Sequence, residues 1–186
     1  MLGFFKRKIK FASPPPVRIS IENQLANLAD VGITLKPNLE ISDLLDRTFK
    51  AYEKNPYIHL LMRMGGVREG AATPIDLYFS DDVWCFDREC IEDHGDYIPA
   101  LKRIAEMVRP TLCVIDIEDY VEIDAGEAWI AFNANGRNHR YALSVDNDWM
   151  SLEILTIFSD LLAASGSNKR FFFSDIGNEV LVVPLF

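Results

Sequence analysis

Carboxylates recur at short intervals between residues 116 and 127 of this sequence. We predict two strands here, 112–117 and 120–123, joined by a turn at Glu118-Asp119. Alternate side chains of a strand share one face, so Ile115 and Ile117 are expected to point inward while the neighbouring carboxylates point outward. The sequence therefore predicts one hairpin whose outer face carries four carboxylates: Asp116, Glu118, Glu122 and Asp124.

Three uses of such a face stay open. Clustered carboxylates could bind magnesium or calcium, or work as an acid–base pair. They could receive a basic protein partner and steer its approach. They could equally form a solvated sheet face whose charges discourage pairing with another chain. For the second use, the expected partner-binding residues are Asp116, Glu118, Asp119, Glu122 and Asp124.

A second set of side chains has the types that bind zinc. Cys85, Cys90 and His94 follow one another closely and Cys113 lies further on, so three thiolates and one imidazole are available for a tetrahedral site. The spacing differs from that of standard zinc knuckles and ribbons. Cys85 and Cys113 also fall in predicted strands, where small buried residues are common. These four residues are weak candidate ligands, and we expect neither a metal nor a cofactor.

The sequence assigns no catalytic residue. It contains no Walker, G-x-S-x-G or HExxH motif. His59 falls in an apolar predicted strand and His139 follows a tight turn, so no nucleophilic triad can be assembled by spacing. This pattern does not favour an enzyme.

Charge is distributed unevenly along the 186 residues. The formal net charge is −9, but residues 76–127 alone contain 15 acidic and 4 basic residues, a net charge of −11. A phosphate backbone requires a basic footprint, so binding of nucleic acid by the body of the protein is excluded. The three cysteines are too few for a disulfide framework, and we expect a cytoplasmic protein.

The first sixteen residues differ from the rest. Residues 1–11 contain four basic and several aromatic residues, and Ser13-Pro14-Pro15-Pro16 follows as a stiff spacer. We expect residues 1–16 to be a head and spacer, and 17–186 to be one compact α+β domain. The head could contact the inner face of a membrane weakly, could be a frayed terminus, or could dock on its own domain.

Hydrophobic periodicity predicts four helices and several short strands. The helices are expected over 20–30, 42–53, 97–108 and 154–161. The strands outside the acidic hairpin are expected over 57–62, 75–79, 83–86, 128–132, 140–145, 171–173 and 180–183. Asn135-Gly136 is a strong hairpin signal, and connections this short join antiparallel strands. The expected fold class is therefore α+β with mainly antiparallel sheet, preceded by a helical N-terminal segment.

Residues 75–124 and 128–184 share the predicted order ββαββ. The distance from Phe79 to Tyr97 is 18 residues, and that from Phe132 to Trp149 is 17. Units of this size are seldom stable alone, so two copies would share a core. We predict an internal duplication, although a common element order can also arise by chance.

The expected function is that of a non-catalytic interaction protein that presents an acidic sheet surface to a basic partner. Small bacterial immunity and inhibitor proteins are similar in charge and size, but no family motif supports the likeness. One alternative is a metal-dependent hydrolase, which needs a cleft where two of the four carboxylates meet a third polar group. Another is a membrane-peripheral adaptor tethered by residues 1–11. A tryptophan exposed beside the acidic hairpin would instead favour binding.

Overall fold

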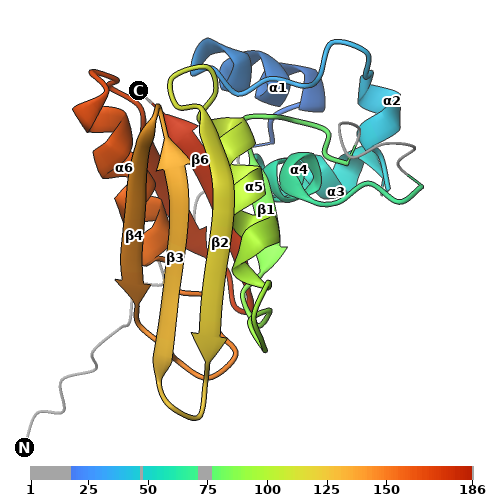
Figure 1. Ribbon diagram of the computed structural model, residues 1–186. Helices are drawn as coiled ribbons and strands as arrows, with labels where there is room; N and C mark the ends of the chain where they lie inside the picture. The colour runs from blue at the N-terminus through green and yellow to red at the C-terminus, as the bar shows by residue number, and fades with distance from the viewer. Residues whose placement is uncertain (1–17, 47, 71–76, 186) are drawn as a thin grey trace, which may run out of the picture.

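The chain folds into a helical N-terminal part followed by two small sheets (Figure 1). The computed structural model describes residues 18–46, 48–70 and 77–185. The N-terminal part contains α1 (Ile21–Asp30), α2 (Ile41–Leu44), α3 (Phe49–Lys54) and α4 (Ile58–Gly65). The remaining elements are β1 (Trp84–Asp87), α5 (Tyr97–Met107), β2 (Val114–Glu122), β3 (Glu127–Ala134), β4 (Arg137–Leu143), α6 (Glu153–Ala164), β5 (Arg170–Asp175) and β6 (Glu179–Leu185). The strands form two antiparallel sheets, β1-β6-β5 and β2-β3-β4, which confirms the α+β class.

The β1-β6-β5 sheet contributes to two hydrophobic cores. Val180 and Val182 of β6 belong to the larger core, together with buried residues of α5, α6 and the β2-β3-β4 sheet. Leu181 belongs to the smaller core, which contains Leu28 of α1 and Met64 of α4. Successive side chains of a strand point to opposite faces. A single strand therefore connects the N-terminal helices to the rest of the molecule.

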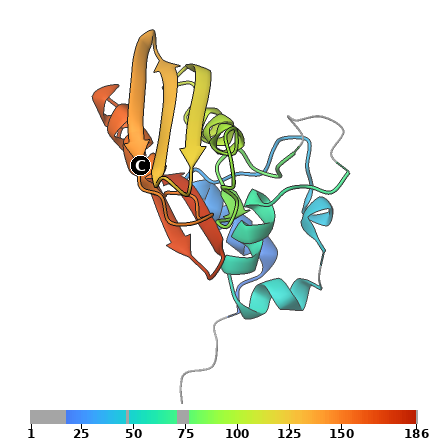
Figure 2. The same cartoon turned by 60° about the horizontal axis from the view of Figure 1, so that its bottom comes forward.

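Only one face of the β2-β3-β4 sheet is covered by helices. Figure 1 looks onto the other face, and no described helix or strand lies in front of it; Figure 2 shows the same sheet from below. The side chains of β3 alternate accordingly. Those in the core are Ala128, Ile130, Phe132 and Ala134, and those partly exposed between them are Trp129, Ala131 and Asn133. We call the uncovered side the outer face.

The predicted first helix and the predicted Asn135-Gly136 hairpin are confirmed. The Ser20 hydroxyl accepts a hydrogen bond of 3.3 Å from the Asn23 N–H and so caps α1. Asn135 and Gly136 have φ angles of 50° and 80°, the left-handed pair that a two-residue hairpin requires. The predicted hairpin therefore forms between β3 and β4.

The second predicted helix and the first predicted strand are both wrong. The expected helix over 42–53 is divided into α2 and α3, because the backbone of Leu45 is extended with a ψ of 104°. The expected strand over 57–62 lies in the helix α4 instead. A short apolar run does not distinguish a strand from a buried helix. Here Leu60 and Met64, four residues apart, are buried on one side of the helix.

The predicted strands 112–117 and 120–123 fall largely within β2, but the turn predicted between them at Glu118-Asp119 is wrong, because β2 runs through both without interruption. The two segments therefore do not form a hairpin with each other. The predicted strand 75–79 lies partly outside the described residues. Within it, Tyr78 forms only an isolated bridge with Val67. The internal duplication therefore stays a prediction.

Two expectations concern the membrane and the N-terminal head. Among the described residues, no helix is both long and apolar enough to cross a membrane. The basic head and spacer, residues 1–16, lie outside the described residues. Whether the head contacts a membrane stays a prediction.

Hydrogen bonds to Glu153 link the end of β4 to the start of α6. Its carboxylate accepts hydrogen bonds from the Ser144 N–H at 3.1 Å, the Ser144 hydroxyl at 2.9 Å and the Ser151 hydroxyl at 3.2 Å. The Ser144 N–H, and after it the Ser144 hydroxyl, lower the pKa of Glu153. These bonds are stronger to the charged form, so they hold β4 and α6 together more tightly while Glu153 is ionised.

We expect Glu153→Gln to lower the melting temperature at neutral pH and to have a smaller effect in acid. A lowered pKa in the folded state stabilises the protein above the unfolded value of about 4.3. This stabilisation is lost as the pH falls through the folded value. Melting curves between about pH 7 and pH 3 measure the difference, with Asp160→Asn on the same helix as the control. A difference between wild type and Glu153→Gln that does not change with pH would contradict this account.

Candidate functional site

A β-bulge in β2 sets the direction of its carboxylates. Ile115 pairs with Asn133 and Glu118 pairs with Ala131, so two residues of β2 lie opposite Phe132 alone. Asp116, one of the two, has a φ of 53°. The alternation predicted for this segment is therefore wrong at Ile115, whose side chain is 52% exposed, while Ile117 packs against the core as expected.

Asp119 does not join the other carboxylates. Its two oxygens accept hydrogen bonds from the Gly95 N–H at 2.7 Å and the Tyr97 N–H at 2.9 Å. These N–H groups lie at the start of α5, where a helix has donors without intrahelical partners and favours negative charge. Asp119 thus links β2 to α5 and lies apart from the other expected partner-binding residues.

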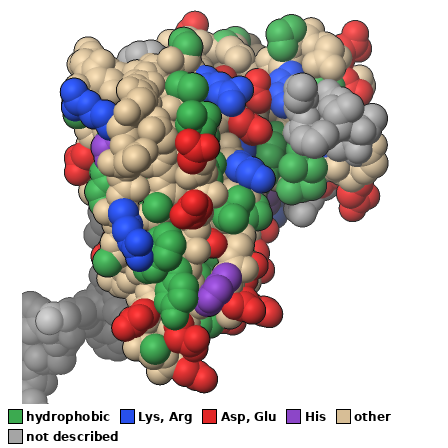
Figure 3. All heavy atoms as spheres, in the orientation of Figure 1, with side chains coloured by type: hydrophobic (Ala, Val, Ile, Leu, Met, Phe, Trp, Pro, Cys, Tyr) green, Lys and Arg blue, Asp and Glu red, His purple; other side chains and the backbone are tan. Residues whose placement is uncertain are grey.

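The outer face carries Glu118, Tyr120 and Glu122 of β2. They lie opposite Ala131, Trp129 and Glu127 of β3, respectively, so each pair shares this face. Figure 3 shows the result from the front: acidic side chains gather at the end of the sheet where β2 turns into β3, and apolar ones lie above them. The face is therefore an aromatic surface bordered by carboxylates.

The Tyr120 and Trp129 rings and the Arg140 guanidinium group stack along this face, and the His94 ring lies tilted against Tyr120. The His94 ring lies 4.6 Å from that of Tyr120, and the Tyr120 ring lies 5.8 Å from that of Trp129, with 5° between the last two planes. The guanidinium carbon of Arg140 lies 3.8 Å from the centre of a Trp129 ring. The Val121 N–H donates a hydrogen bond of 3.3 Å to His94 Nδ1. Such contacts hold the side chains in place before any partner binds.

Sequence reasoning missed this stack. The sequence favours a solvated loop or a weak zinc site for His94, and core packing is the default expectation for each tryptophan. That holds for Trp84, which is buried, whereas Trp129 is partly exposed on the outer face. The signal was the alternation of Glu118, Tyr120 and Glu122, which places an aromatic ring between two carboxylates on one face.

A hollow of about 420 Å³ lies beside the bulge. Asp116 and Glu118 line it from β2, with polar residues of the neighbouring strands: Asn133, Asn138, His139 and Arg140. Two carboxylates therefore meet further polar groups, as the hydrolase alternative requires. In the part of the chain that the structure describes, however, no three His, Cys, Asp or Glu side chains are placed to hold a metal ion. The arrangement suits a cationic side chain of a partner.

At the other end of the outer face, Glu122 and Glu127 lie directly opposite each other. Both are exposed, and Asp124 lies in the turn that connects their strands. Like charges directly opposite across an antiparallel pair destabilise the sheet. A cation bound between them would remove this cost.

The candidate zinc ligands are not assembled. Among the described residues, no three of Cys85, Cys90, His94 and Cys113 come close enough to bind one ion. Burial, and after it the charge of Glu179, raises the pKa of the Cys85 thiol to about 11. Burial and nearby carboxylates, Asp87 first among them, raise the pKa of Cys90 to about 11 as well. Neither thiol is activated at neutral pH.

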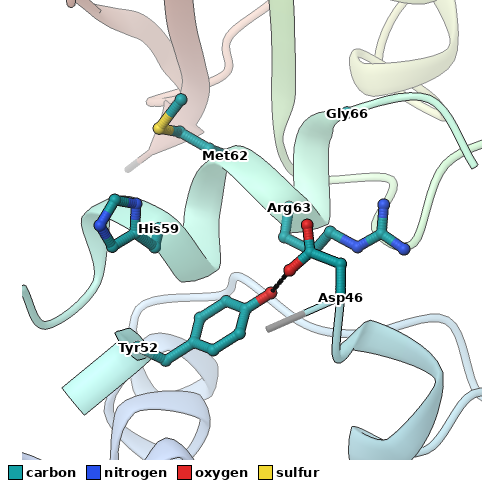
Figure 4. A pocket seen from close by; sticks show the side chains of 6 residues that line it. All are labelled: Asp46, Tyr52, His59, Met62, Arg63 and Gly66. Atoms are coloured by element: carbon teal, nitrogen blue, oxygen red, sulfur yellow. Dashed lines mark hydrogen bonds between the residues drawn. The ribbon is translucent and has the colours of Figure 1, made fainter. Parts of the chain in front are cut away.

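A polar hollow of about 190 Å³ lies between α3 and α4 (Figure 4). The Tyr52 hydroxyl donates to Asp46 Oδ1 at 2.5 Å. Burial, and after it this hydrogen bond, raises the pKa of Tyr52 to about 12, so the hydroxyl remains a donor at neutral pH. Arg63 donates to the Leu44 carbonyl at 3.0 Å and lies over the Phe79 ring. These contacts tie the N-terminal helices together.

Comparison with known proteins adds no further constraint. No family model, curated protein or solved structure matches this chain.

We expect Asp119→Asn to destabilise the fold because it removes the charge that binds the start of α5. Loss of a helix cap costs about 0.5–2 kcal/mol, which urea unfolding followed by circular dichroism resolves. Asp124→Asn, in the turn after β2, serves as the matched control and is expected to have little effect. Equal free energies of unfolding for the two variants would show that Asp119 does not cap α5.

Proposed function

We propose that this chain is a non-catalytic interaction protein that binds a basic protein partner on the outer face of the β2-β3-β4 sheet. The observation that carries the proposal is the pair Glu122 and Glu127, two exposed carboxylates directly opposite each other at one end of an uncovered aromatic surface. This arrangement costs the free protein stability, and a cationic partner offsets that cost.

The composition of the outer face supports the same function. Tyr, Trp and Arg are the residues that contribute most often to the centre of protein interfaces. Tyr120, Trp129 and Arg140 supply all three types, and their mutual stacking limits the side-chain entropy lost on binding. Carboxylates at both ends of the surface would orient the partner and speed its approach.

The hollow beside the bulge gives the partner a defined contact. A guanidinium group can form two parallel hydrogen bonds with a carboxylate, and here Asp116 and Glu118 line one hollow. We therefore expect an arginine of the partner to bind there. Inhibitors and immunity proteins that mask a basic surface are the class that this chemistry fits best.

The hydrolase alternative rests on the same hollow. Two carboxylates lie there beside amide and imidazole groups, which meets its geometric requirement. The binding proposal is favoured because the aromatic stack and the Glu122–Glu127 pair have no use in hydrolysis. Binding of a basic partner uses both the carboxylates and the aromatic stack.

We expect Glu122→Gln to change stability and binding in opposite directions. Removing one of two facing charges should raise the free energy of unfolding by about 0.2–1 kcal/mol. The triple variant Glu118→Gln, Glu122→Gln, Glu127→Gln should lose about tenfold or more in partner capture, the effect of 1.4 kcal/mol. Affinity capture from lysate of the producing cells, quantified by mass spectrometry, measures the second effect.

The matched control removes three exposed carboxylates away from the outer face: Glu22→Gln and Asp30→Asn on α1, and Asp160→Asn on α6. It has the same net charge as the triple variant but should retain the captured proteins. Equal losses in the two variants would mean that only overall charge matters. Identical captured proteins in wild type and the triple variant would refute the proposal.

A further inference from the structure

An apolar groove of about 580 Å³ lies between α4, β1 and α5. The larger side chains of its walls are Met62, Tyr78, Trp84, Phe86, Pro99 and Met150. The rings of Trp84 and Phe86 stack with their centres 3.9 Å apart. The groove is separate from the outer face, because none of its lining residues belongs to β2, β3 or β4.

Carboxylates border this apolar surface. Asp87, Asp96 and Glu179 line the groove, and no described Lys or Arg does so. Asp87 of β1 and Glu179 of β6 lie directly opposite each other, a second pair of facing like charges. The groove therefore suits an occupant that has both apolar and cationic side chains.

Residues 1–11 of the same chain have this composition. They contain four basic residues, Lys6, Arg7, Lys8 and Lys10, and no acidic residue. In an extended conformation Phe5, Ile9 and Phe11 would share one face with Arg7, and the three lysines would share the other with Phe4. The apolar face matches the groove, and the charges match its border.

The start of α1 lies within reach of the groove. Gln24 of α1 donates to the Tyr52 carbonyl at 3.3 Å and accepts from the Tyr57 N–H at 2.7 Å, which fixes the start of α1 against α3 and α4. Met62, at the groove, lies five residues further along α4, or about 8 Å at 1.5 Å per residue. Six residues separate Phe11 from Arg18, and the seven steps from one to the other span up to about 24 Å. The spacer is therefore long enough.

We propose that residues 1–11 bind in the groove between α4, β1 and α5 of their own chain. Phe5, Ile9 and Phe11 cover the apolar walls, and the lysine side chains lie beside Asp87 and Glu179. Bound in this way, the head covers an apolar surface that the domain otherwise exposes. The docking is independent of the partner proposed for the outer face.

Two cysteines report directly on occupancy of the groove. Cys85 and Cys90 line it, whereas Cys113 is exposed just before β2 and does not. We suggest measuring alkylation by N-ethylmaleimide at each cysteine by mass spectrometry, in the full chain and in a variant that lacks residues 2–12. Cys85 and Cys90 should react about tenfold more slowly in the full chain, equivalent to about 1.4 kcal/mol of docking free energy. Cys113 should react equally in both.

Two further variants keep the test independent of the deletion. Reversing the charges of the head (Lys6→Glu, Arg7→Glu, Lys8→Glu, Lys10→Glu) should remove the protection as the deletion does. In a Glu179→Lys background, the alkylation rate of Cys85 and Cys90 in the deletion variant, divided by the rate in the full chain, should fall toward one. The ratio cancels any direct effect of residue 179 on the Cys85 thiol. An Asp160→Lys background, which adds the same charge on α6, should leave the ratio unchanged.

Three results would overturn the proposal. The first is equal alkylation of Cys85 and Cys90 in the full chain and the deletion variant. The second is protection that increases with protein concentration, which would assign the groove to the head of a second copy. The third is protection that appears only with vesicles containing phosphatidylserine, which would make a membrane the ligand of the head.

Discussion

The Asp119 carboxylate determines how β2 presents its side chains. By accepting hydrogen bonds from the Gly95 and Tyr97 N–H groups, it turns inward and joins the strand to the start of α5. Side chains of a strand alternate, so the same constraint turns Glu118, Tyr120 and Glu122 outward. The bulge at Asp116 then brings a further carboxylate to the hollow that Glu118 lines. One inward carboxylate thus orients the acidic and aromatic residues of the outer face.

Facing carboxylates occur at two separate places in this chain. Glu122 lies opposite Glu127 on the outer face, and Asp87 lies opposite Glu179 beside the apolar groove. Each pair lowers the stability of its sheet, and each borders aromatic side chains. The excess negative charge of residues 76–127 is therefore divided between two surfaces. We propose a cationic ligand for both surfaces, an external partner at the first and the basic head at the second.

The sequence predicted the features that short patterns determine. The Asn135-Gly136 hairpin, α1, α5 and the acidic character of β2 all follow from turn chemistry, periodicity and charge. The bulge could not be predicted, because Ile115-Asp116-Ile117 alternates regularly and gives no sign of a positive φ at Asp116. Glu118-Asp119 resembles a turn in the sequence because both residues are polar. The N–H groups that bind Asp119 lie 22 and 24 residues away, so local sequence does not reveal that Asp119 points inward from a continuous strand. The strand predicted over 57–62 is wrong because an apolar run fits a strand or a helix equally well. Packing of Leu60 and Met64 in the smaller core, which the local sequence does not show, selects the helix.

The central claim is that the outer face of the β2-β3-β4 sheet is the surface that binds a basic partner. Hydroxyl-radical footprinting of the captured complex tests it at single residues, since oxidation reports the solvent exposure of each ring. Binding should reduce the oxidation of Tyr120 and Trp129 and leave that of Phe172, exposed on β5, unchanged. Unchanged oxidation of Tyr120 and Trp129 in the complex, with protection elsewhere, would contradict the account.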